Sequence, residues 1–203
     1  MLKRFYGRIV FRNVILSGTM AMLATVSAMI ACPAVVSADD PAAVSSIAPD
    51  HAAIEEVRSG KCDEAMAVWW GFDPEDATDA LQAAIDSGAK RVVVADTGSP
   101  WIIARTIRLR SDQEIVLEKG VVLLAKKDCF KGTSEAMLLA SEVSNVTLKG
   151  YGAEVRMRKA DYHTADYVQA EWRHALSIRS CCDITVLGVS LCESGGGGIY
   201  LGT

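Results

Sequence analysis

The spacing of apolar residues changes near Lys90, and this change divides the chain into two kinds of structure. Upstream of it, apolar side chains recur at helical spacing, at Ala77, Ala80, Leu81, Ala84 and Ile85. The stripe predicts an amphipathic helix with Asp73 as N-cap, Pro74 at its first position and Gly88 as its stop. A helix with one apolar face must pack that face against another part of the protein.

Beyond Lys90 the apolar residues follow a period of two, which is typical of strands. The pairs are Ile107/Leu109, Ile115/Leu117, Val121/Leu123, Val146/Leu148, Val155/Met157, Leu176/Ile178, Ile184/Val186, Val189/Leu191 and Ile199/Leu201. Each predicted strand is short and is bounded by turn residues. No second strong helical pattern interrupts them, which argues against alternating strands and helices. The sequence therefore predicts an all-β body.

An internal repeat indicates how the strands are arranged. Residues 138–150, "LLASEVSNVTLKG", align without gaps on residues 176–188, "LSIRSCCDITVLG", and a looser copy covers residues 111–125. Each copy contains a polar turn residue, an apolar-x-apolar strand, a glycine bend and a second such strand. This pattern predicts the coils of a β-solenoid, in which inward side chains stack between neighbouring coils. The largest predicted bulge from the coils is the loop over about 158–174.

The segments "GFDPEDATDALQAAIDSGAKRVVVADTGSPWII", "SNVTLKGYGAEV" and "CDITVLGVSL" resemble the N-terminal cap and coils of the pectate lyase superfamily. The resemblance covers roughly Trp69 to Thr203. It implies a right-handed parallel β-helix with an N-terminal capping α-helix. It also implies a carbohydrate-active protein, although this fold hosts many activities.

The catalytic motifs of that superfamily are not matched here. The Asn-x-Asp and Gly-Asp-Asp motifs of polygalacturonase-like members are missing, and the sequence does not identify the Arg or Lys base of pectate-lyase-like members. A lyase-like activity would imply calcium held by acidic residues. Glu193 precedes the glycine run, and Gly197 stands where the family pattern often has Asp before Gly-Ile. We keep Glu193 as a catalytic candidate, and Gly197 lowers the expectation of catalysis.

The loop and strand start over residues 158–175, "RKADYHTADYVQAEWRHA", gather the strongest candidates for ligand contact. His174 is a candidate acid or base, and the planar fork of Arg173 is suited to fixing a carboxylate. The substrate-binding candidates, aromatic rings for sugar faces and a carboxylate for hydroxyls, are Tyr162, Tyr167, Trp172 and Asp161. The alternative is a solvated loop whose aromatic rings pack on the outer wall of the solenoid. No metal-ligating residues are predicted.

The first 38 residues predict export. Four basic residues precede an acid-free apolar stretch, and small residues up to Ala38 fit a signal peptide that is cut there. Two alternatives stay open: an uncleaved anchor over Val14 to Val36, and a lipoprotein box at Met29 to Cys32. Residues 39–68 are expected to be a linker with a short helix, capped by Asp50. Residues 69–203 are expected to be the cap and first coils of the solenoid.

The net charge limits which ligands are expected, and the number of cysteines limits which disulfides are possible. Removing 38 of the 203 residues leaves 165, with 17 bases and 25 acids, a formal net charge of −8. An acidic exported domain is a poor nucleic-acid binder, and no stable membrane insertion is expected after cleavage. Five cysteines remain, an odd number without zinc-like spacing, so buried thiols, one disulfide and a reactive thiol all stay open. The periplasm or the extracellular space is the expected location.

The leading expectation is an exported polysaccharide lyase or glycoside hydrolase-like protein that acts on or binds extracellular polysaccharide. The alternatives are a non-catalytic β-solenoid that binds glycans or serves as a surface scaffold, and an inactive truncated fragment. The C-terminal sequence "CESGGGGIYLGT" favours truncation, because the glycines make a bend, Ile199 and Leu201 begin another strand, and no cap follows. Such an open coil predicts self-association through its edge.

Overall fold

The computed structural model describes residues 9–12, 15–17 and 45–203. The predicted cleavage position after Ala38, the lipoprotein box and most of the alternative anchor lie outside the described residues. None of the helices within the described ranges is long and apolar enough to cross a membrane.

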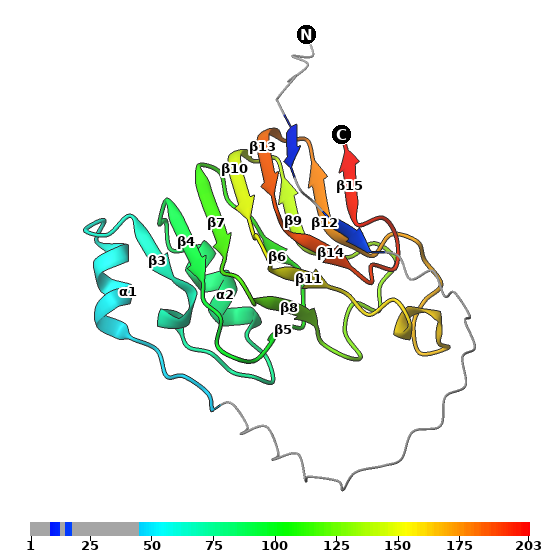
Figure 1. Cartoon of the computed structure of the whole chain (residues 1–203), viewed down its shortest axis with the longest axis horizontal. Coiled ribbons are helices and arrows are strands. Elements are labelled where there is room, and N and C mark those ends of the chain that lie inside the picture. Colours follow the sequence, from blue (N-terminus) through cyan, green and yellow to red (C-terminus); the bar gives the residue numbers. More distant parts are fainter. Residues whose placement is uncertain (1–8, 13–14, 18–44) are drawn as a thin grey trace, which may run out of the picture.

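The strands from Lys90 onward wind into successive coils (Figure 1). In chain order the coils are β4 (Arg91–Val94), β5 (Trp101–Ile103) and β6 (Ile107–Arg108); β7 (Gln113–Leu117), β8 (Val122–Ala125) and β9 (Ala136–Ser141); β10 (Ser144–Lys149), β11 (Glu154–Arg156) and β12 (His174–Arg179); and β13 (Cys182–Leu187), β14 (Ser190–Cys192) and β15 (Ile199–Gly202). Equivalent strands pair in parallel and form three sheets. The predicted all-β parallel β-helix is confirmed.

The core contains columns of apolar side chains, and each sheet contributes at least one. Register pairing places one residue of every coil in each column, in the order Val92, Ile115, Leu148 and Val186; Trp101, Leu123, Val155 and Leu191; and Ile107, Leu138, Leu176 and Ile199. All but Ile199 are buried. Burying one such side chain stabilises the fold by roughly 1.5–3 kcal/mol. Stacking of like residues is therefore what makes the repeat a solenoid.

The repeat found in the sequence matches the observed register. Leu138 pairs with Leu176, and Val146 pairs with Ile184, each 38 residues apart. The polar turn residues also coincide, because Asn145 and Asp183 have left-handed φ values of 55° and 54°. Asp112 occupies the same turn one coil earlier and accepts a hydrogen bond of 2.9 Å from Asn145. Short polar side chains tolerate this conformation better than other non-glycine residues do.

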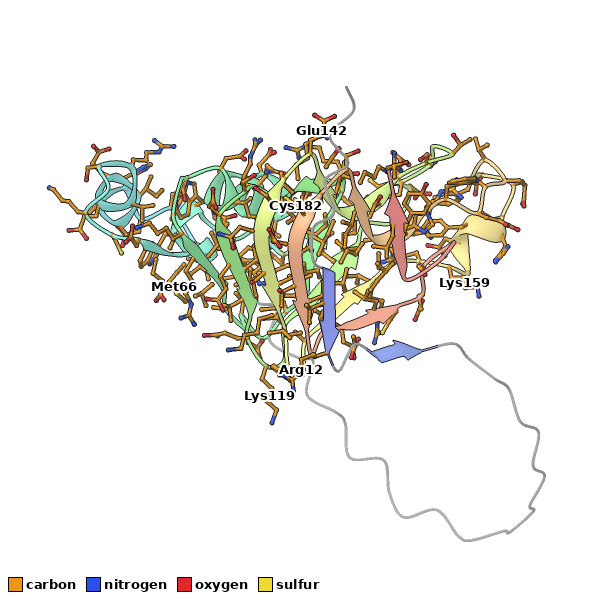
Figure 2. The ribbon with its side chains drawn as sticks, turned by 90° about the horizontal axis from the view of Figure 1, so that it is seen from above. Arg12, Met66, Lys119, Glu142, Lys159 and Cys182 are labelled. Atoms are coloured by element: carbon orange, nitrogen blue, oxygen red, sulfur yellow. The ribbon has the colours of Figure 1, made fainter. Side chains whose placement is uncertain are left out.

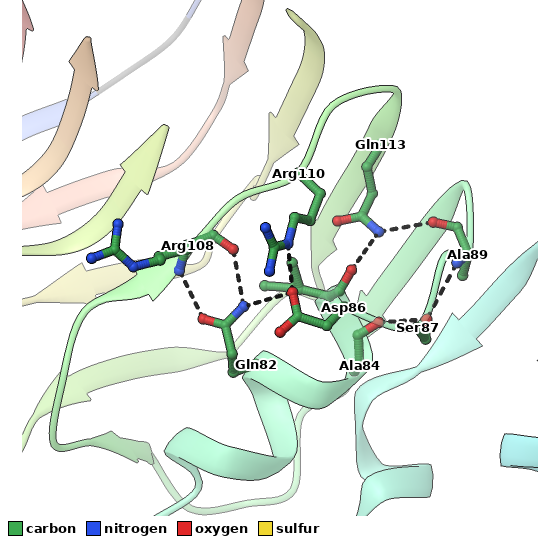
Figure 3. Close-up of polar contacts among 9 residues, drawn as sticks. Gln82, Ala84, Asp86, Ser87, Ala89, Arg108, Arg110 and Gln113 are labelled. Atoms are coloured by element: carbon green, nitrogen blue, oxygen red, sulfur yellow. Dashed lines mark hydrogen bonds and ion pairs between the residues drawn. The ribbon is translucent and has the colours of Figure 1, made fainter. Parts of the chain in front are cut away.

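The helix α2 (Thr78–Ile85) covers the N-terminal edges of the two sheets that begin with β5 and β6. The remaining sheet begins with β3 (Glu64–Met66), which pairs with β4. The side-chain amide of Gln82 both donates to and accepts from the main chain of Arg108 in β6, as a neighbouring strand would (Figure 3). Ala77 donates to the carbonyl of Ile102 in β5. Polar main-chain groups at these edges are thereby satisfied.

The predicted start of this helix was wrong. Asp73 accepts a hydrogen bond from the amide of Glu75 in a turn, and helical structure begins only at Thr78. Tertiary contacts explain the shift, since the amide of Ala77 is bonded to β5 and Thr78 Oγ1 accepts from Ala104. By contrast, α1 (His51–Arg58) begins as predicted, with Asp50 accepting from two helix amides. It lies beside β3 at one end of the stack (Figure 1).

Two short strands from the N-terminal segment lie at the other end of the stack. β1 (Ile9–Arg12) pairs with β13, and β2 (Ile15–Ser17) pairs with β14, both in parallel. Figure 2 shows β1 alongside β13, with Arg12 and Cys182 labelled. The sheet of β6, β9, β12 and β15, here called the third sheet, ends with β15 paired to β12. The strand predicted around Ile199 and Leu201 is therefore confirmed.

Candidate functional site

The long loop between β11 and β12 places its aromatic residues in two separate groups. The first, here called the inner cluster, contains Tyr162, Tyr167 and Arg173. The second, here called the Tyr200 cluster, contains Trp172, His174, Arg179 and Tyr200. The sequence predicts one candidate surface for the whole loop, whereas in the structure one part of the loop is buried and another part is exposed.

The guanidinium of Arg173 is the centre of the inner cluster. Its side chain is fully buried and donates to four main-chain carbonyls, those of Phe130 (2.7 Å), Val168 (2.7 Å), Lys131 (3.1 Å) and Ala170 (3.4 Å). The guanidinium carbon lies 5.0 Å from the ring centroid of Tyr162 and 5.7 Å from that of Tyr167. Cation–π contacts and carbonyl oxygens thus replace its hydration shell.

The two tyrosines of the inner cluster pack edge to face, with ring centroids 5.3 Å apart. Burial raises the pKa of Tyr162 to about 12, because the phenolate would be desolvated. The same cause raises the pKa of Tyr167. Their exposed fractions are 3% and 6%, so neither ring has a face available for a sugar. Their placement does not support the predicted substrate contacts, and the contacts of Arg173 describe a structural tie between two loops.

The two carboxylate candidates, Asp161 and Glu193, lie in different segments of the structure. Asp161 belongs to the short 3-10 helix η2 (Asp161–His163) and forms an ion pair of 3.5 Å with Arg158. Glu193 is exposed in the turn after β14 and has a left-handed φ of 51°. The roles predicted for both, substrate contact for Asp161 and catalysis for Glu193, stay predictions.

The Tyr200 cluster combines exposed aromatic surface with a buried histidine. The ring of Tyr200 in β15 stacks on His174 at the start of β12, and its centroid lies 6.0 Å from that of Trp172. Trp172 is 52% exposed, whereas His174 is 5% exposed. The guanidinium carbon of Arg179 lies 5.4 Å from the Tyr200 centroid. Two predicted residues, Trp172 and His174, are therefore brought together with two that were not predicted.

Hydrogen bonds fix the polar members of this cluster. His174 Nδ1 lies 3.0 Å from the carbonyl oxygen of Gly197, while its Nε2 is buried without a hydrogen-bond partner among the described residues. Arg179 donates from Nε to the hydroxyl of Ser177 (3.1 Å) and from Nη2 to that of Ser134 (3.3 Å). The cluster thus presents a ring platform beside an oriented cation.

The glycine run connects the two clusters. A Cβ at Gly196 would overlap the carbonyl oxygen of Glu171, and one at Gly195 would lie 2.6 Å from the ring of Tyr162. The amide of Gly196 donates to the carbonyl of Arg173. Only glycine permits this close approach. The run is therefore a packing device that holds the end of the loop against β15.

Tyr200 and Arg179 were missed in the sequence, although a signal for both was present. Register pairing puts Tyr200 opposite Ser177, between Ile199 and Leu201, which lie opposite the buried residues Leu176 and Ile178. Alternation therefore assigns Tyr200 to the outer face of the sheet, and Arg179 to the same face two residues beyond Ser177. What the sequence could not show is that the loop brings Trp172 and His174 to the same place.

No three His, Cys, Asp or Glu side chains among the described residues come together in a set that could hold a metal ion. The calcium implied by a lyase-like activity thus finds no ligand set there. Cys62, Cys129, Cys181 and Cys182 are partly buried free thiols, and Cys192 is buried. Burial raises the pKa of the Cys129 thiol.

Comparison with solved structures gives modest likenesses, of which one is described here. No protein-family model matches the chain, and no curated protein matches it. A crystal structure from Parabacteroides merdae, described as that of a candidate glycosyl hydrolase, superposes with a TM-score of 0.45 at 19% identity, over 68% of this chain and 79% of that chain. A likeness at this level carries no argument about function. The parallel β-helix stands on the sheets themselves, and membership of the pectate lyase superfamily stays a prediction.

Proposed function

We propose that this chain is a carbohydrate-active β-helix protein that binds polysaccharide at the Tyr200 cluster. The observation that supports this proposal best is the half-exposed ring of Trp172, which lies 6.0 Å from Tyr200 on the outer side of the third sheet. Aromatic rings with exposed faces stack on the apolar faces of sugars, and nearby polar groups orient the hydroxyls.

Arg179 supplies the polar part of the proposed site. Its two hydrogen bonds to serine hydroxyls hold the guanidinium beside the Tyr200 ring. A guanidinium held in this way has further N–H groups for the oxygens of a ligand, and its orientation costs little entropy on binding. The outer face of a solenoid is extended, which suits a polymer better than a small molecule.

Export of the protein belongs to the same proposal. The basic start of the chain and the apolar stretch that follows it support a periplasmic or extracellular location. A polysaccharide ligand would be met there. The acidic balance of the remaining chain fits a ligand other than nucleic acid.

Catalysis is the second candidate, and one observation favours it. Nε2 of His174 is buried without a hydrogen-bond partner in the described residues and belongs to a ring stacked on the platform. Because this nitrogen is buried, proton transfer to or from a bound sugar would require the loop over residues 158–175 to move and expose it. The chain would then be a lyase or hydrolase-like enzyme, with Glu193 as the predicted carboxylate.

Binding is tested with the full chain against neutral and uronate-containing polysaccharides by isothermal calorimetry or affinity electrophoresis. Trp172→Ala is expected to weaken binding about tenfold, equivalent to roughly 1.4 kcal/mol. Tyr151→Ala is the matched control, because Tyr151 is 48% exposed on a different turn. Absence of binding to every polysaccharide, or equal losses in both variants, would overturn the proposal.

The catalytic candidate has its own assay. Incubation with the same polysaccharides, with and without calcium, is followed by new reducing ends and by the absorbance of unsaturated uronides. Turnover that disappears in His174→Ala supports catalysis. Binding without either signal supports the non-catalytic alternative.

A further inference from the structure

The edge of the last coil is occupied by residues from the opposite end of the chain. β1 and β2 pair with β13 and β14, and the amide of Gly188 donates a hydrogen bond of 2.8 Å to the carbonyl of Arg12 (Figure 2). Neither β1 nor β2 belongs to the coils built by residues 91–202. They therefore add one parallel strand to each of two sheets, beside β13 and β14.

The pairing follows one constant register. Ile9 pairs with Ile184, and Ile15 pairs with Ser190, so both pairs are separated by 175 positions. Residues 9–12 and 15–17 thus keep one register against residues 184–187 and 190–192. Ile9 and Phe11 fall opposite Ile184 and Val186, which are core positions of the last coil. Leu16 falls opposite Leu191, the core position of β14.

This register repeats the rule that joins genuine coils. Core columns in the solenoid contain one apolar residue from each coil, and Ile9, Phe11 and Leu16 supply apolar residues at the matching positions. A strand edge offers unpaired N–H and C=O groups, which a segment of suitable pattern can satisfy by adding a strand. An arbitrary apolar segment could form the same main-chain hydrogen bonds, but its apolar residues would not fall opposite the core positions of both β13 and β14.

We propose that the edge of β13 and β14 is a strand-acceptor site and that residues 9–17 of the same chain are its ligand. The site recognises main-chain groups along the edge, in the register that sets Ile9 and Phe11 opposite Ile184 and Val186. This interaction is independent of the proposed polysaccharide binding, because the Tyr200 cluster lies on β12 and β15 in the third sheet.

The docked state of this segment competes with the export predicted for it. A signal peptide must be free of the folded domain to be recognised and cut, whereas residues 9–12 and 15–17 lie in the sheets when the domain is folded. The two states exclude each other. Folding before export therefore hides the segment, and cleavage after Ala38 would remove the ligand and leave the edge of β13 and β14 without it.

Cysteine pairing in the full chain tests the register. Val10 and Thr185 are direct strand partners, so a Val10→Cys, Thr185→Cys variant is expected to form a disulfide within one chain on mild oxidation. The control is Val10→Cys, Thr147→Cys, since Thr147 lies opposite Thr185 on the far neighbour β10. Two strand spacings, about 9.6 Å, exceed the reach of a disulfide. Peptide mapping should show at least ten times more linkage in the first variant.

Hydrogen exchange gives a second readout that needs no cysteine. Phe11→Asp is expected to speed exchange of the Gly188 amide, which donates to Arg12, at least tenfold. The Ser190 amide, which donates to Ala153 of the preceding coil, is the internal control, and Val36→Asp, outside the segment, should leave both unchanged. Equal linkage in both cysteine variants, linkage only between two chains, or exchange that does not respond to Phe11→Asp would overturn the proposal. Linkage between chains would instead assign the ligand segment to a second copy.

Discussion

The ring of His174 stacks on the ring of Tyr200, with centroids 5.0 Å apart and planes inclined by 16°. The two residues come from the paired strands β12 and β15, and the glycine run leads into β15. His174 is 95% buried, and it also reaches the carbonyl of Gly197 with Nδ1. The histidine therefore holds both the Tyr200 ring and the end of the glycine run in place.

This stack predicts that His174 acts on polysaccharide binding through Tyr200. His174→Ala should weaken binding about two- to tenfold, the range expected for losing one aromatic pair. His174→Phe keeps a flat ring at the same position and should retain most of the affinity. Calorimetric titration of both variants with the bound polysaccharide checks this. Weak binding in His174→Phe would show that the imidazole nitrogens, rather than the stack, are needed.

A second prediction concerns the buried cation. Arg173→Met removes the donor for four carbonyls, and each buried acceptor left unpaired costs about 1–3 kcal/mol before relaxation. We expect the free energy of unfolding in urea to fall by more than about 2 kcal/mol. Arg105→Met is the control, because the exposed pair of Arg105 with Asp79 contributes less than about 1 kcal/mol. Similar losses in the two variants would refute the structural role of Arg173.

The glycine run gives a third prediction. Gly196→Ala should lower the free energy of unfolding by about 1–3 kcal/mol, since the added methyl group meets the main chain of Glu171. Gly197→Ala should cost clearly less, because its nearest neighbour would be the carbonyl oxygen of Ile199 at 3.2 Å. Thermal and urea unfolding of the two variants measure this difference. A reversed order would mean that the loop packs differently from the structure described here.

The buried phenol of Tyr162 predicts how stability changes at high pH. Its folded pKa is raised to about 12, above the ordinary value of 10.0. Below pH 10 both states keep the proton and the full contribution is present. Between about pH 10 and pH 12 the unfolded chain loses the proton first, so the free energy of unfolding falls as pH rises.

The measurement is urea unfolding at a series of pH values, compared with Tyr162→Phe. The variant lacks the titrating phenol and should show a shallower decline over the same window. Tyr167, whose pKa is also raised, contributes to the decline that remains. Identical slopes for the wild-type chain and Tyr162→Phe would contradict the burial of this phenol.

Much of the solenoid could be predicted because its information is local and repeated. The gapless match of residues 138–150 to 176–188 became the register of β9 with β12 and of β10 with β13. The start of α2 could not be predicted in this way, because hydrogen bonds of Ala77 and Thr78 to the β5 segment decide it. Capping preferences are weaker than such tertiary contacts.

The candidate site was predictable only in part. The composition of the loop over residues 158–175 indicated Trp172 and His174 together with Tyr162, Tyr167 and Arg173. Composition does not say which aromatic ring faces solvent. Arg173 determines this, because its four carbonyl contacts draw Tyr162 and Tyr167 inward and leave Trp172 outside.

The sequence by itself determined the coil, since inward and outward positions follow from the period of two and from the repeat. Only the tertiary structure decided the contacts between coils and loops. It placed Tyr200 against His174 and residues 9–17 against residues 184–192. The physical reason is the separation along the chain. Alternation is set by neighbouring residues, whereas these contacts join residues 26 and 175 positions apart. A single sequence carries no periodic signal for such contacts.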